Sequence, residues 1–257
     1  MSGSQTPALD GVEFTYDWYE RALQWLSDHG YESTSFEDDV GDGDLLLRHD
    51  VDLSPRKALE IGRIEADLGF RSTYFFLVSN PLYNVFDAVC RAVIDEIDSL
   101  GHDVGVHFST HQHWSRRPSP DELRERVTAE RSALSLAAEN VCDPVSFHCP
   151  PEWVIDRRFD RLATTYEPRF FSEATYVADS GQRWRESHPF DTRLSERVQL
   201  LTHPGLWGET DLPYTERVTS SIDENVGYAE RLLTDQHLRE KFDPPVELPE
   251  REPATDR

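Results

Sequence analysis

The chain has 257 residues and a formal net charge of −23, with 49 acidic residues against 26 lysines and arginines. Such an acidic surface repels nucleic acid and anionic membranes, which excludes both as partners. The apolar stretches are too short to cross a bilayer and the first residues lack an apolar signal region, so we expect a cytoplasmic protein without a membrane span. Three cysteines without CxxC spacing predict neither a disulfide framework nor a zinc ribbon.

The acidic residues are dispersed along the chain, and lysine occurs only at Lys57 and Lys241. This composition resembles that of proteins from salt-accumulating haloarchaea, in which screening by salt makes self-repulsion tolerable. It indicates a halophilic habitat and is silent about activity.

Predicted helices and strands alternate over the first two thirds of the chain. Apolar residues at helical spacing predict a helix within 14–31, and an acidic turn follows it. The strand at 45–51 leads into a helix over 54–70, with Ser54 as N-cap and Pro55 at the first helical position. The pattern then predicts strands at 72–79, 102–109, 144–149 and 197–203, and helices at 85–101, 119–140 and around 216–238.

This alternation predicts a mainly parallel sheet with crossover helices. We expect one α/β domain over 44–240, a distorted (β/α) barrel of about seven parallel strands with its chemistry at the C-terminal strand ends. The helix and acidic turn of 1–43 pack on this barrel, and 241–257 form an extended or disordered tail. A doubly wound sheet is the alternative, but no GxGxxG follows any strand.

Candidate metal ligands gather at these strand ends. Strand 45–51 ends in "HDVD", an Asp-x-Asp pair, and the strand at 102–109 ends in "HFSTH", an HxxxH pair. Imidazole and carboxylate suit zinc and related divalent ions, and a catalytic site needs about three protein ligands. Six of the ten histidines lie at four strand ends, which indicates a metal site there: His49, His107, His111, His113, His148 and His203.

The order of the motifs resembles that of the polysaccharide deacetylases of the NodB-homology type, carbohydrate esterase family 4, and of their surface-polysaccharide-cluster subgroup. The family fold is a distorted (β/α) barrel. The likeness of "HDVD" to the first motif implies that Asp50 is the catalytic base and Asp52 a metal ligand. "HFSTH" is similar to the second motif, which implies His107 and His111 as ligands, with Phe108 where Ser or Thr is usual. His148 is the alternative to His111.

Three further segments extend the resemblance to about residue 207. "FHCPPEW" resembles the third, groove-lining motif, but has no arginine there. "DSGQRW" resembles the segment whose Asp orients the base, and the likeness of "LLTH" to the last motif implies a catalytic acid. The resemblance therefore implies catalytic roles for Asp179, Arg183 and His203, and substrate contacts for His148, Pro150, Trp184 and Trp207. Asp50 has a second interpretation, as a mere ion-pair partner of Arg48 or Arg183.

The function implied by the resemblance is that of a hydrolase with one divalent metal, most simply zinc. It would remove an N-acetyl or O-acetyl group from a carbohydrate, such as a surface-polysaccharide precursor. Two alternatives stay open: a metal hydrolase of a non-sugar amide, as in allantoinase-like relatives of the family, and a sugar-binding barrel without turnover. The sequence predicts no oligomeric state.

The charge predicts a stability that depends on salt. Self-repulsion of a net charge of −23 is unscreened at low ionic strength, because the Debye length is about 10 Å at 0.1 M salt and about 3 Å at 1 M. We expect the melting temperature to rise steadily across a potassium chloride series. A melting temperature that stays flat or falls with added salt contradicts the halophilic interpretation.

Overall fold

In the computed structural model of the chain, the described residues are 9, 11–191 and 194–234. The predicted tail at 241–257 lies outside them. Within these ranges no helix is long and apolar enough to cross a membrane.

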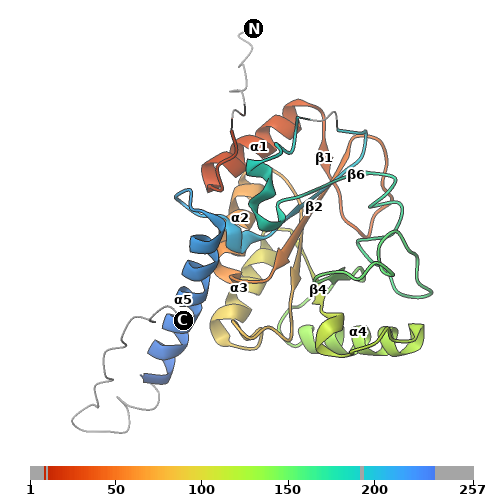
Figure 1. Cartoon of the computed structure of the whole chain (residues 1–257), viewed down its shortest axis with the longest axis vertical. Coiled ribbons are helices and arrows are strands. Elements are labelled where there is room, and N and C mark those ends of the chain that lie inside the picture. The colour runs from red at the N-terminus through yellow and green to blue at the C-terminus, as the bar shows by residue number, and fades with distance from the viewer. Residues whose placement is uncertain (1–8, 10, 192–193, 235–257) are drawn as a thin grey trace.

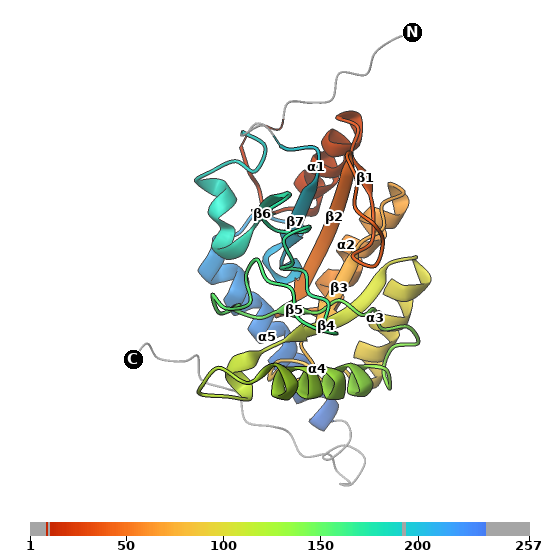
Figure 2. The same ribbon diagram turned by 90° about the vertical axis from the view of Figure 1, so that its right-hand side faces the viewer.

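Seven strands of the described residues form one sheet in which each of the pairings between them is parallel. The strand order is β5-β4-β3-β2-β7-β6, with β1 pairing on the N-terminal part of β2 (Figure 2). The sheet curls into a half-barrel, which confirms the predicted distorted barrel of about seven strands. The strands are β1 (Glu32–Ser33), β2 (Asp44–Val51), β3 (Thr73–Phe76), β4 (Asp103–Phe108), β5 (Ser146–Phe147), β6 (Thr175–Ala178) and β7 (Val198–Thr202).

Helices α1, α2, α3 and α5 gather on one side of the strands, and α4 packs against β4 (Figure 1). Ser54 caps α2 by accepting from the backbone N–H of Lys57, and Pro55 is the first helical residue, as predicted. The helices are α1 (Tyr16–Asp28), α2 (Pro55–Asp67), α3 (Ala88–Ser99), α4 (Pro120–Leu134) and α5 (Tyr214–Leu233). Short 3₁₀ turns are η1 (Thr110–Gln112), η2 (Ser180–Arg185) and η3 (Pro204–Leu206).

Strand β2 is buried on both faces, which explains its run of three consecutive leucines at 45–47. Alternate side chains point to opposite faces of a strand. Leu45 and Leu47 join the large core beneath the helices, whereas Leu46 joins a small core inside the curl with Phe75. Gly105 on β4 makes room for this inner core, because a Cβ there would lie 2.7 Å from the Phe75 ring. Residues 48 and 50 share the inner face with Leu46, so they point into the barrel.

The outer face of β2 carries a buried polar network centred on Glu65 of α2. The Glu65 carboxylate accepts hydrogen bonds from Tyr19 at 2.5 Å and Tyr74 at 2.7 Å, and one from Ser72 at 2.5 Å. His49 Nε2 lies 2.7 Å from Glu65 Oε1. Burial alone raises the pKa of Glu65, but the attraction and hydrogen bond of His49 outweigh it and lower the pKa to about 2. The network joins α1, α2, β2 and β3.

Glu65→Gln should destabilise the fold, and less so in acid. The folded pKa of about 2 lies below the ordinary value of 4.5, so the carboxylate contributes stability above pH 4.5 and loses it as the pH falls toward 2. At about 1.4 kcal/mol per pKa unit, the loss at pH 7 is about 3 kcal/mol.

Urea unfolding of wild type and variant at pH 7 and pH 3, in high salt, measures this difference. Glu96→Gln, which removes an exposed partner of Arg63, is the control and should stay near wild type at both pH values. If the free energy of unfolding differs between wild type and Glu65→Gln by as much at pH 3 as at pH 7, the lowered pKa of Glu65 is contradicted.

Candidate metal centre

The predicted site residues meet at one edge of the sheet. Strands β2, β4, β5 and β7 are parallel, so their C-terminal ends lie on the same side of the barrel. Asp52 follows β2 by one residue, His107 is the penultimate residue of β4, and His148 and His203 directly follow β5 and β7. The backbone N–H of Asp52 donates to the carbonyl of Asp50 at 3.0 Å and turns the chain at the strand end.

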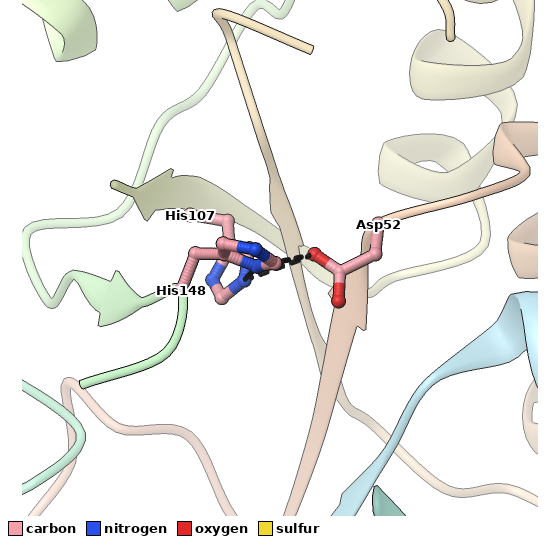
Figure 3. Close-up of side chains that lie close together, drawn as sticks. All are labelled: Asp52, His107 and His148. Atoms are coloured by element: carbon pink, nitrogen blue, oxygen red, sulfur yellow. Dashed lines mark hydrogen bonds and ion pairs between the residues drawn. The ribbon is translucent and has the colours of Figure 1, made fainter. Parts of the chain in front are cut away.

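Three side chains converge closely enough to hold one ion (Figure 3). Asp52 Oδ1 lies 3.2 Å from His107 Nε2 and 3.0 Å from His148 Nδ1, and the two nitrogens are 3.3 Å apart. A tetrahedral ion with bonds of about 2.0–2.1 Å holds its ligand atoms about 3.3–3.4 Å apart. The donor set therefore fits a divalent ion such as zinc after small adjustments, with a fourth position left for water or substrate.

His111, the predicted third ligand, lies outside this group. Its Nε2 atom approaches the carbonyl oxygen of Cys149 at 3.2 Å, and the side chain is exposed. The turn η1 begins at Thr110, so the chain leaves the strand between the two histidines of the HxxxH pair. The backbone of His148 instead donates to the carbonyl of Phe108 at 2.9 Å, which brings its ring beside β4. The group of possible donors therefore contains His148, the alternative ligand, and not His111.

Asp50 forms a buried, two-point ion pair with Arg48. Arg48 Nε lies 3.0 Å from Asp50 Oδ1, and its Nη2 lies 2.7 Å from Asp50 Oδ2. Burial raises the pKa of Asp50, but the Arg48 guanidinium and then His107 outweigh it, so the pKa is lowered. Arg183, the other candidate for an ion pair with Asp50, is exposed and donates from Nε to the Ser180 carbonyl. An arginine from the same strand therefore stands beside the predicted base.

His203 lies beside Asp52 and is held by Asp179. His203 Nδ1 lies 2.6 Å from Asp179 Oδ1, and its Nε2 lies 3.9 Å from Asp52 Oδ2. Burial opposes the imidazolium, but attraction and hydrogen bonding by Asp179 outweigh it and raise the pKa of His203 to about 9. Trp207 Nε1 donates to the second oxygen of Asp179 at 2.8 Å. The predicted orienting acid is thus placed against His203 and not against Asp50.

The two tryptophans predicted to contact substrate lie in the core. Trp207 is 0% exposed and Trp184 is 4% exposed, and both pack with Phe14 and Trp18. Neither presents a ring face to a ligand, because the aromatic cluster beneath α1 covers them. Pro150 is half-buried, and its predicted substrate contact stays a prediction.

Sequence reasoning missed Ser146, which lies beside Asp50 and His107. Ser146 is paired directly with His107 in the β4–β5 register, and it precedes His148 by two residues on the same strand edge. Its Oγ donates to Asp50 Oδ1 at 2.7 Å. The period of two along β5 could have placed Ser146 and His148 on one face, but no motif marks a serine there.

Comparison with known proteins finds a likeness to solved structures. No family model matches the chain, and no curated protein matches it. The peptidoglycan deacetylase PdaC of Bacillus subtilis is 13% identical with a TM-score of 0.43, over 79% of this chain and 100% of that one. A CE4-family pseudoenzyme of Bacillus anthracis is 15% identical with a TM-score of 0.41, over 72% and 60%.

A family 4 acetyl xylan esterase of Clostridium thermocellum, in complex with a cobalt ion, is 12% identical with a TM-score of 0.39, over 72% of this chain and 84% of that one. This chain spans only 60–63% of the length of the pseudoenzyme structures. At these identities and TM-scores the likenesses carry no argument about activity.

Substitutions at the ion position should separate the two ligand sets. Asp52→Ala, His107→Ala and His148→Ala each remove one of three ligand atoms, so each should abolish stoichiometric zinc binding at micromolar protein. His111→Ala should bind zinc like wild type, because His111 lies outside the group. Metal analysis after dialysis measures this, with the exposed His29→Ala as a control. If His148→Ala keeps zinc and His111→Ala loses it, His111 is the third ligand, as predicted from sequence.

Proposed function

We propose that the protein is a zinc-dependent deacetylase of the NodB-homology family that acts on a carbohydrate, with Asp52, His107 and His148 as ligands. Two ion pairs lie next to this donor group, each made of one acidic and one basic side chain, and this observation carries the proposal. Asp50, paired with Arg48, lies beside His107, and His203, paired with Asp179, lies beside Asp52. A site of this composition offers an anionic proton acceptor and a cationic proton donor next to the proposed ligands.

The chain's own residues then divide the work of amide hydrolysis. Bound zinc would supply Lewis acidity toward an acyl oxygen and a lowered pKa for water. Asp50 is kept anionic by Arg48, so it is ready to accept a proton from an attacking water. His203 is kept protonated by Asp179, so it is ready to give a proton to the leaving amine or alcohol. Arg48 and Asp179 each hold their partner in place.

The choice of an acetylated sugar as substrate is supported by the order of the sequence motifs. A surface-polysaccharide precursor is the finer form of this proposal. Partly exposed Trp114 and Trp153 follow β4 and β5, beyond the C-terminal strand ends, and we propose them for stacking on a sugar. Arg117 Cζ lies 5.2 Å from the centre of the Trp153 ring, over one of its faces.

Acetate release by the zinc-loaded protein in high salt tests the proposal. We expect acetate release from N-acetylated or O-acetylated oligosaccharides and no ring-opening hydrolysis of allantoin. If the protein opens the allantoin ring but releases no acetate from the oligosaccharides, the function moves to the non-sugar amide hydrolases. If it binds stoichiometric zinc but hydrolyses none of these substrates, the sugar-binding barrel without turnover is the remaining function.

His203→Ala should separate proton transfer from metal binding. The side chain touches the ion position only through the 3.9 Å approach to Asp52, so zinc content and fold should match wild type. Loss of a positioned proton donor should lower kcat by about 10²–10⁴-fold. Metal analysis and initial rates on the same preparation measure both, with His29→Ala as the control. A near-normal rate in His203→Ala removes this residue from the reaction.

A further inference from the structure

Ser146 occupies the junction between the Arg48–Asp50 ion pair and the proposed ligand His107. Its side chain is 0% exposed and lies on β5 directly opposite His107. Its Oγ atom is 2.7 Å from Asp50 Oδ1, 2.6 Å from His107 Nδ1 and 2.9 Å from Arg48 Nη2. One hydroxyl therefore contacts a carboxylate, an imidazole and a guanidinium at once.

The single hydroxyl proton has only one possible destination. A guanidinium donates and never accepts, so Ser146 can only accept from Arg48. The Asp50 carboxylate faces two N–H groups of Arg48 and is an acceptor only, so the proton between Ser146 Oγ and Asp50 Oδ1 must come from the serine. Two oxygens at 2.7 Å with no proton between them would repel each other.

This assignment decides the tautomer of His107. Because the serine proton is directed to Asp50, the 2.6 Å contact between Ser146 and His107 is a hydrogen bond only if His107 Nδ1 is the donor. A neutral imidazole has one N–H, so Nε2 then carries a lone pair, which can face the Asp52 carboxylate favourably only when a cation lies between them. Nε2 is the atom that lies 3.2 Å from Asp52 and 3.3 Å from His148 at the ion position.

We infer that Ser146 is a positioning residue that relays the negative charge of Asp50 to His107 and locks this histidine in the Nδ1–H tautomer, with Nε2 ready to bind the ion. The inference rests on the proposed metal site. Ligating histidines commonly donate their second ring N–H to a carboxylate or carbonyl, and here a serine hydroxyl stands between ring and carboxylate. Asp50 then has two roles: it accepts a proton in the reaction, and through Ser146 it holds a metal ligand in place.

The tautomer is measured directly by long-range ¹H–¹⁵N correlation spectra of the zinc-loaded protein. Wild type should show His107 protonated at Nδ1. A wild-type ring protonated only at Nε2 overturns the inference without any variant.

Ser146→Ala removes the hydroxyl that accepts from His107 Nδ1–H. Zinc affinity, from competition with a chromogenic chelator, should fall by about 10- to 100-fold. Ser146→Thr keeps the hydroxyl and should retain a zinc affinity within a few-fold of wild type. Ser221→Ala is the matched control: this serine is also fully buried, accepts from Lys57 and donates to the Gly205 carbonyl. An unchanged zinc affinity in Ser146→Ala overturns the inference.

These readouts are independent of turnover. A protein that shows the predicted tautomer and loses zinc affinity in Ser146→Ala, but releases no acetate, contradicts the proposed function and supports the relay. Acetate release by Ser146→Ala at the wild-type zinc affinity supports the function and contradicts the relay.

Discussion

The buried ion pair of Arg48 and Asp50 is the interaction around which the barrel interior is arranged. Placing two charges inside a core costs several kcal/mol per ion unless their remaining hydrogen-bonding capacity is used. Here Arg48 also donates to Gln199, Ser146 and Tyr166. These contacts join β2, β5, β7 and the chain beyond β5, so satisfying one guanidinium draws the walls of the half-barrel together.

The same contacts explain how the barrel closes without a complete ring of strands. Within the described residues, β5 and β6 are the two edges of the sheet. The gap between them is filled by the chain around Tyr166, whose hydroxyl bonds to Arg48 and to the Phe147 carbonyl. Gln199 on β7 donates to the Thr165 and Phe170 carbonyls. Side chains therefore satisfy backbone carbonyls between β5 and β7, next to the parallel bridge of Val145 and Thr164.

The two faces of β2 serve different needs through alternate residues. The inner face carries Arg48 and Asp50 toward the site. On the outer face, His49 links Glu65 of α2 to Thr202, with Nδ1 2.6 Å from the Thr202 hydroxyl. Thr202 immediately precedes His203, so the outer network fixes the relative position of β2 and β7 and hence of the two proton carriers proposed above. A change of one residue in register would exchange these faces and destroy both networks.

The sequence by itself determined the local structure and the position of the site. Ser54 and Pro55 start α2 because capping chemistry and the fixed φ of proline act within one turn. Alternation of strand and helix determined a parallel sheet, and the strand ends in "HDVD", "HFSTH" and "LLTH" located the chemistry, because parallel strands bring their C-terminal ends to one edge. The two-residue strand β1 escaped prediction, since so short a segment has no period to detect.

Tertiary structure alone decided which side chains meet. His111 is four residues from His107 in sequence, yet the 3₁₀ turn η1 takes it to the surface, whereas His148 from another strand reaches the donor group. Spacing fixes directions only while one regular element continues, and the β4 strand ends between the two histidines of the pair. The partner of His203 was decided in the same way, because its hydrogen bond to Asp179 depends on the register of strands and loops, which no local pattern records. The pairing of Asp50 with Arg48 is local by contrast, because residues two apart share one face of a strand.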